Sequence, residues 1–131
     1  MKQMVYKKER CREILDEGTY KGFNYVIYSL GLHPTAYIEI PKEHRLYDVS
    51  DDELDYIDVH GGITYNSDHL PMPDGTNKDG CFIGWDYAHC YDYSGIYEIA
   101  ELPSDSSLMN SKKWTTEEIL DDVFSVINQI F

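Results

Sequence analysis

Two short stretches of the sequence each place a carboxylate and a histidine close together among apolar residues. Asp58 and His60 lie two positions apart, so on a β-strand their side chains would point to the same face. Asp86 and His89 lie three positions apart, where an apolar run passes into a loop. Zinc takes histidine nitrogen and carboxylate oxygen ligands in a tetrahedron. If the two stretches form neighbouring strands, these four residues are candidate ligands of one zinc ion.

Other chemistry stays open for the same residues. Without a metal, Asp58 could accept hydrogen bonds from the amides of the glycine pair at 61–62, and both histidines could be satisfied in the core. With four protein ligands the ion would be structural, because no position is left for water. If an aspartate only orients a histidine, His60, Asp86 and His89 could form a small metal-dependent hydrolase that acts on a nucleotide. The reserve ligands are Cys81, Cys90, His33 and Asp92.

The strands that would carry these residues follow from the pattern of apolar side chains. Residues 23–28 and 36–40 are rich in β-branched and aromatic residues and flank a turn, which predicts a hairpin. Residues 57–65 predict a third strand that the glycine pair interrupts. Residues 81–86 predict a buried fourth strand, and residues 66–80 predict a long loop before it.

Helices are expected at both ends of the chain. Residues 4–17 have a modest helical periodicity and end before Gly18, a residue type that is common just after a helix. In the C-terminal stretch Thr115 and Glu118 form a capping box, and apolar residues recur at helical spacing. Residues 95–102 would add a fifth strand. The sequence therefore predicts one α+β domain over residues 1–131, with both helices packed on an antiparallel sheet of four to five strands.

The chain is acidic, and its charge is concentrated in the middle. The net charge is −13, and residues 23–111 hold sixteen carboxylates against three Lys and Arg. This pattern disfavours direct binding to nucleic acid and favours a basic partner, although solubility alone would also account for it. The S-x-x-E pattern from Ser50 predicts a short helical turn within the most acidic stretch. The candidate partner-binding residues are Asp48, Asp51, Asp52, Glu53 and Asp55.

Nothing in the sequence indicates export or membrane insertion. No stretch approaches the roughly 20 apolar residues that span a bilayer, and the first ten residues lack an apolar run like that of a signal peptide. Three cysteines, an odd number, fit reduced thiols better than a disulfide framework. We therefore expect a cytoplasmic protein that does not contact membranes.

Three sequence blocks, in order, resemble a family of small phage-encoded proteins. They are PKEHRLY from residue 41, DVHGGITY from residue 58 and GWDYAHCYD from residue 84. The corresponding family patterns are P-K-x-H-P-x-Y, H-G-G-[LI]-T-[YF] and G-[FW]-D-x-A-H-x-x-D, and the resemblance covers residues 30–92. Where family members often show G-H-x-C-G-Y, this chain has GLHPTAY from residue 31, which weakens a ligand role for His33.

The resemblance implies a phage or mobile-element origin. Proteins that this chain resembles include zinc-binding anti-CRISPR inhibitors of type II CRISPR effector nucleases, which hold nucleic acid in positively charged channels. The leading hypothesis is a metal-stabilised acidic inhibitor, not an enzyme, that binds such a host nuclease and blocks DNA loading. Sequestration of a small signalling nucleotide is less favoured, because phosphates need cationic or amide-rich pockets.

Overall fold

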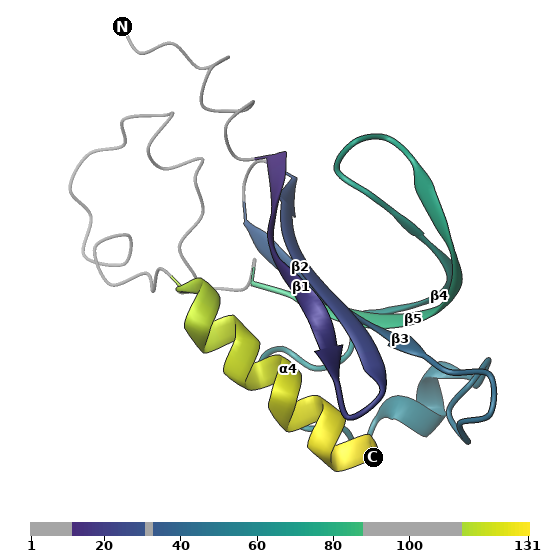
Figure 1. Ribbon diagram of the computed structural model, residues 1–131. Coiled ribbons are helices and arrows are strands. Elements are labelled where there is room, and N and C mark those ends of the chain that lie inside the picture. Colours follow the sequence, from purple (N-terminus) through teal and green to yellow (C-terminus); the bar gives the residue numbers. More distant parts are fainter. Residues whose placement is uncertain (1–11, 31–32, 88–113) are drawn as a thin grey trace, which may run out of the picture.

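The computed structural model describes residues 12–30, 33–87 and 114–131, and Figure 1 shows a twisted antiparallel sheet with a helix along one face. Within these residues the sheet has five strands in the order β1-β2-β3-β5-β4. The strands are β1 (Arg12–Tyr20), β2 (Phe23–Leu30), β3 (Pro34–Ile40), β4 (Tyr65–Pro71) and β5 (Asn77–Asp86). A short 3-10 helix, η1 (Asp51–Leu54), follows β3, and the helix α4 (Thr116–Ile130) closes the chain. Of the predicted α+β architecture, the antiparallel sheet and the C-terminal helix are confirmed.

The helix α4 packs its apolar stripe on one face of the sheet. Its start is set by the predicted capping box: the Glu118 N–H donates to Thr115 Oγ1 (3.2 Å), and the Thr115 N–H donates to the Glu118 carboxylate (3.1 Å). The helix residues that are buried against the sheet are Ile119, Val123, Val126, Ile127 and Ile130. Burial of each such side chain is worth about 1.5–3 kcal/mol, so this face holds the main core.

The hairpin formed by β4 and β5 curls over the opposite face of the sheet. Tyr28 in β2 donates a hydrogen bond from its hydroxyl to the carbonyl oxygen of Pro71 (2.6 Å), although β2 and β4 are not neighbours in the sheet. Leu70 is fully buried here, beside Val26 and Phe82. Burial raises the pKa of Tyr28, so its hydroxyl stays a neutral donor. This second, smaller core fixes where the polar residues of β4 lie.

Gly84 makes room for a row of tyrosine rings across this second face. In the strand register Gly84 lies between Tyr37 of β3 and Tyr65 of β4. A Cβ at position 84 would overlap the Tyr37 ring and lie 2.6 Å from the Ala36 carbonyl oxygen. The Tyr37 ring instead reaches Tyr65 (centroids 5.2 Å apart) and, on its other side, Tyr28 (5.1 Å). The glycine of the third block thus serves packing.

The predicted N-terminal helix is wrong over residues 12–17, which belong to strand β1; residues 4–11 lie outside the described residues. Gly18 lies inside the strand and pairs with Tyr25. The strand has a register shift between Ile14 and Asp16. Leu15 packs against the main core, whereas Ile14 is 41% exposed. The shift interrupts the alternation of buried and exposed side chains that is typical of a strand. The adjacent apolar residues Ile14 and Leu15 therefore resemble part of a helical pattern.

The third predicted strand, residues 57–65, is also wrong. Gly61 and Gly62 have φ angles of +71° and +78°, and such a pair makes a turn rather than a bulge within a strand. Strand β4 begins only at Tyr65, so residues 66–80, predicted as a loop, form most of a hairpin. Its polar residues are tolerated because β4 is an edge strand.

The other predicted elements have mixed outcomes. The hairpin of residues 23–28 and 36–40 is confirmed by the pairing of β2 with β3. Residues 81–86 are the second half of β5, and the fifth strand predicted at 95–102 lies outside the described residues. No helix within the described ranges has the length and apolar character needed to cross a membrane.

Candidate functional site

The predicted zinc ligands Asp58 and His60 lie in the turn that precedes β4, and both contact the C-terminal part of the chain. The His60 ring stacks on Tyr87, with centroids 5.1 Å apart and planes 5° apart, and also meets Trp114 at 4.7 Å. Asp58 is exposed, and its backbone N–H and carbonyl each form a 2.8 Å hydrogen bond with the Gln129 side chain of α4. The backbone of this turn is thus fixed to the helix.

Asp86 ends strand β5, half-buried, in register with Thr35 of β3. Across the described residues, no three His, Cys, Asp or Glu side chains gather closely enough to hold a metal ion. Asp58, His60 and Asp86 therefore do not form such a group among themselves, and His89 lies outside the described residues. The four-ligand zinc site remains a prediction, as does the hydrolase that would use His60, Asp86 and His89.

The reserve ligands also fall in different places. Cys81 is buried in β5, where its sulfur accepts a hydrogen bond, and His33 is half-buried just before β3. Cys90 and Asp92 lie outside the described residues. Neither of the two described residues belongs to a candidate metal group within the described part of the chain.

His44, in the first sequence block, holds the C-terminal end of α4. Its Nδ1 accepts the N–H of Leu46 (3.0 Å), so the proton lies on Nε2, which donates to the Ile130 carbonyl oxygen (2.8 Å). The Arg45 guanidinium donates to the same oxygen (3.1 Å). The last carbonyl groups of a helix lack partners within the helix, and a cation beside them suits the helix dipole. This block therefore stabilises a helix end that lies 86 residues further along the chain.

Tyr87, in the third block, links the end of β5 to α4. The Trp85 Nε1–H donates to the Tyr87 hydroxyl (2.9 Å), which donates to the Asp122 carboxylate (2.6 Å). Both aromatic side chains are fully buried, and the hydrogen bonds satisfy polar groups that would be costly to bury alone. Trp85 and Tyr87 are thus core residues.

The five predicted partner-binding carboxylates are exposed on one continuous stretch, residues 48–55, which we call the acidic segment. Helix η1 starts after Ser50 as predicted, although the Ser50 side chain makes no capping hydrogen bond. Within the described part of the chain, the carboxylates of Asp52, Glu53 and Asp55 form no hydrogen bond or ion pair. These charges are directed into solvent and are available to a partner.

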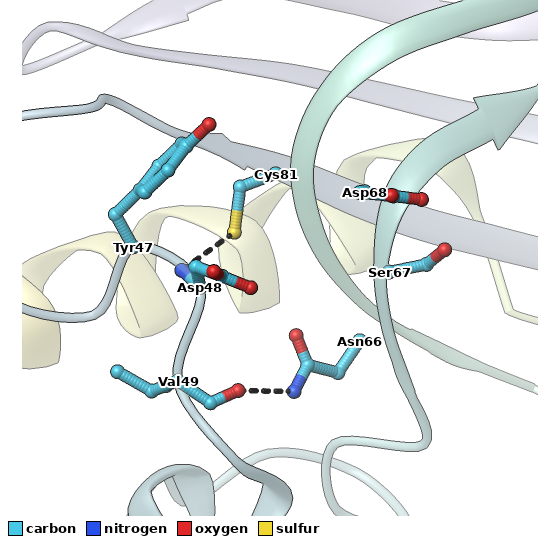
Figure 2. A pocket seen from close by; sticks show the side chains of 7 residues that line it. All are labelled: Tyr47, Asp48, Val49, Asn66, Ser67, Asp68 and Cys81. Carbon is cyan, nitrogen blue, oxygen red and sulfur yellow. Dashed lines mark hydrogen bonds between the residues drawn. The ribbon is translucent and has the colours of Figure 1, made fainter.

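A pocket of about 540 Å³ opens between the start of the acidic segment and strand β4 (Figure 2). It is lined by Tyr47, Asp48, Val49, Asn66, Ser67, Asp68 and Cys81. The Asp48 N–H donates to the buried Cys81 sulfur (3.3 Å), and Asp48 has a φ of +58°, a left-handed conformation that Asp tolerates better than most residues. On the opposite wall, the Asn66 amide donates to the Val49 carbonyl oxygen (2.9 Å).

Asp68 brings a second carboxylate to this pocket, and sequence analysis missed it. Its side chain pairs with His69 Nδ1 at 3.0 Å, and this hydrogen bond is the main cause that lowers the pKa of Asp68. Asp68 therefore stays charged at neutral pH. Its position depends on the pairing of β4 with β5, and residues 66–80 were predicted as a loop, so no local pattern pointed to it.

A second, more open pocket of about 560 Å³ lies at the other end of the acidic segment. It is lined by Arg45, Leu46, Asp52, Glu53, Asp55 and Tyr56. Tyr56 is 53% exposed, and its hydroxyl accepts a hydrogen bond from the Arg45 guanidinium (3.1 Å). The acidic segment thus borders two hollows, one of which carries an exposed aromatic ring.

The electrostatic setting of both pockets is strongly negative. The described residues include nineteen Asp and Glu against five Lys and Arg. No Lys or Arg with a described side chain forms an ion pair with a carboxylate of the acidic segment. A cation near this surface would be attracted, with a strength that falls as salt is added.

The described residues form an antiparallel sheet, a capped C-terminal helix and an acidic surface that contains two pockets. Comparison of the chain with protein-family models, with curated proteins and with solved structures finds no match in any of the three. The geometry and charge of this surface therefore carry the functional interpretation.

Proposed function

We propose that the chain is a binding protein that docks its acidic segment onto a basic surface of a nucleic-acid-handling protein. The observation that carries this proposal is the set of exposed carboxylates at Asp52, Glu53 and Asp55, which have no cationic partner among the described residues and lie beside the exposed Tyr56. A basic partner would supply the missing counter-charges. Exposed charges of this kind mainly accelerate association and select the partner.

Tyr56 supports the same proposal through a different kind of contact. Tyrosine is enriched among the residues that contribute most to the binding free energy of protein interfaces. Its rigid ring buries a large area at a small cost in conformational entropy. Tyr56 is hydrogen-bonded to Arg45, which also donates to the end of α4. The ring is therefore presented on a fixed support, next to the carboxylates.

The resemblance of the three sequence blocks suggests the class of partner. A type II CRISPR effector nuclease in the cytoplasm of the host cell has positively charged channels for its nucleic acids. A chain that occupies one of these basic surfaces would block DNA loading without any catalysis. This partner is the first one to test.

Zinc is a separate proposal that concerns the fold. Because Asp58, His60 and Asp86 do not form a metal group by themselves, an ion would need further ligands, such as His89. Elemental analysis of protein purified without added metal tests this directly. If zinc is present and structural, a chelator will lower the melting temperature of the protein. A chelator-treated protein that melts at the same temperature as the untreated protein would contradict the proposal.

Binding to the purified effector tests the proposed function. The triple variant D52N/E53Q/D55N should weaken binding by about tenfold or more, because it removes three exposed charges from the contact surface. The matched control E13Q/E117Q/D121N removes three exposed charges from other elements and should bind like the unmodified chain. Circular dichroism and thermal unfolding show that both variants are folded.

Two further readings complete this test. The affinity should fall as salt rises, because the attraction between exposed charges is screened. In a gel-shift assay, the unmodified chain should prevent the guide-loaded effector from binding DNA, and the first triple variant should not. Equal weakening by both triple variants, or an affinity that does not change with salt, would contradict the proposal.

A further inference from the structure

We infer that the pocket between Asp48 and Asp68 receives an arginine side chain of the basic partner. This inference rests on the proposed function and adds to it a docking site and the chemistry of the group that enters it. The pocket shares Asp48 and Val49 with the acidic segment and adds a second element, because Asp68 and Asn66 belong to strand β4.

The groups available to a ligand in this pocket are mainly acceptors. Asn66 uses its amide nitrogen twice, toward the Val49 carbonyl oxygen and the Asp51 carboxylate, both at 2.9 Å. With both amide hydrogens engaged, its carbonyl oxygen remains as an acceptor, and Figure 2 shows it turned away from Val49. Together with the carboxylates of Asp48 and Asp68, it makes a lining that suits a donor with positive charge.

The two carboxylates are held from separate parts of the fold. On the loop side, the Asp48 backbone is fixed by its hydrogen bond to Cys81, which is only 5% exposed in β5. On the strand side, Asp68 is paired with its neighbour His69, and the Asp68 side chain is 95% exposed. Figure 2 shows Asp48 on the loop side and Asp68 on the strand side, with the Asp68 carboxylate directed away from Asp48. The fold therefore sets the backbone positions of the two residues, and Asp68 supplies its charge from the exposed rim of the pocket.

The size and donor set of the pocket favour a guanidinium group over a metal ion. Its volume of about 540 Å³ lies within the range of about 300–1,000 Å³ that is usual for pockets that hold organic groups. No three metal-ligating side chains gather in the described part of the chain, this pocket included. A guanidinium has five N–H donors in a planar fork and can bridge acceptors on two walls, whereas a lysine ammonium is a compact point charge.

The surroundings supply the remaining reasons for an arginine of a protein partner. The described residues carry almost four carboxylates for each Lys or Arg, so the pocket lies in a field that concentrates cations. Tyr47 also lines the pocket, and an aromatic ring attracts a guanidinium through the cation–π interaction. Charge complementarity therefore selects an arginine-bearing segment of the partner that binds the acidic segment.

Nuclear magnetic resonance of the full chain, titrated with short peptides, tests the inference. The probe is acetyl-Gly-Arg-Gly-amide, and the isosteric control replaces arginine by the uncharged citrulline. We expect saturable shifts of the Asn66 side-chain amide and the Ser67 and Asp68 backbone amides with the arginine peptide, and none with the citrulline peptide. The corresponding lysine peptide should bind at least about threefold more weakly, because it cannot form a bidentate contact.

Charge-neutral variants localise the effect. D48N and D68N should each weaken the arginine peptide by about fivefold, whereas D121N, on the exposed side of α4, should leave it unchanged. Asparagine tolerates the left-handed conformation at position 48, and position 68 lies on an exposed edge strand, so both variants should fold. Shifts spread evenly over all acidic residues, equal binding of arginine and lysine peptides, or tighter binding of Ca²⁺ at the same amides would each overturn the inference.

The inference and the proposed function can fail separately. If the effector loses affinity for D52N/E53Q/D55N but not for D48N/D68N, the arginine pocket is wrong and the binding function stands. If the arginine peptide binds the pocket but the effector does not bind the unmodified chain, the pocket stands and the proposed partner is wrong.

Discussion

Residues 41–47 and residues 48–55 are adjacent in the sequence, yet their side chains meet different surroundings. In the first stretch His44 packs edge-on against Phe23 and donates to the Ile130 carbonyl oxygen, so it serves the helix end. In the second stretch the carboxylates of Asp52, Glu53 and Asp55 point into solvent. His44, which could act as a metal ligand or a base, thus stabilises the fold. The carboxylates of the acidic segment, which resemble ordinary surface charges, form the candidate site.

The same contrast applies to the other two blocks. His60 stacks on Tyr87. The Tyr87 hydroxyl accepts a hydrogen bond from Trp85 and donates one to Asp122. A polar side chain that is taken out of water needs such partners, so buried histidine and tyrosine are more often explained by packing than by catalysis. We therefore expect substitutions in the blocks to reduce stability, and substitutions in the acidic segment to reduce binding alone.

The largest effect is expected at Gly84. G84A places a methyl group against the Tyr37 ring and 2.6 Å from the Ala36 carbonyl oxygen, and neither can move without disturbing β3. We expect a loss of about 3 kcal/mol in the free energy of unfolding, measured with urea. D121A, on the exposed side of α4, should change it by less than about 0.5 kcal/mol. A loss below about 1 kcal/mol for G84A would mean that the tyrosine row is not tightly packed.

Tyr87 should show the next largest effect. Y87F removes the hydroxyl that accepts from Trp85 and donates to Asp122, which leaves the buried indole N–H without this partner. We expect a loss of about 2 kcal/mol in thermal or urea unfolding. Y56F is the matched control, because the Tyr56 hydroxyl is exposed and should matter by less than about 0.5 kcal/mol. Equal losses of unfolding free energy in Y87F and Y56F would contradict the view that the residues of the third block stabilise the fold more than exposed residues do.

His44 should have a smaller effect on stability. H44A removes the acceptor of the Leu46 N–H and one of two donors to the Ile130 carbonyl oxygen, while Arg45 keeps the second. The expected loss is about 1.5 kcal/mol, against less than about 0.5 kcal/mol for H69A on the exposed edge strand. Amide hydrogen exchange should also show faster opening of the last turn of α4 in H44A. An unchanged exchange rate there would argue against the role of His44 at the helix end.

The smallest effect concerns the charge of Asp68. The hydrogen bond from His69 holds the pKa of Asp68 below its ordinary value of 3.8, so H69A should raise it toward that value in a carboxyl-carbon titration. Because the pKa is lowered in the folded state, the contribution to stability is present above pH 3.8 and is lost as the pH falls through the folded value. The pKa of Asp74 is lowered by hydrogen bonds from Thr76 and should not respond to H69A. A parallel rise at both residues would show that the His69 contact is not the cause.

Several elements could be read from the sequence because their signals are local. The capping box of Thr115 and Glu118 and the apolar stripe behind it are complete within one helix, and the structure has both. The hairpin of β2 and β3 likewise joins two β-rich runs across a short turn. The acidic segment was also recognisable, because exposure of a dense run of carboxylates follows from the cost of burying charge.

The misassigned elements depend on pairing between distant residues. Residues 12–17 form a strand because β2 offers an edge, and the register shift at Ile14 and Asp16 hides the alternation that would have revealed it. Strand β4 has few apolar residues and exists because β5 pairs with it and Leu70 is buried under the curled hairpin. Such long-range pairing leaves little trace in a local pattern.

The sequence by itself determined the capped helix, the central hairpin and the negative charge of the middle of the chain, since caps, periodicity and composition act over a few residues. Only the tertiary structure decided that His44 meets Ile130 and that Asp68 shares a pocket with Asp48. Both contacts depend on the order and register of strands, and these are set by the burial of the two cores as a whole.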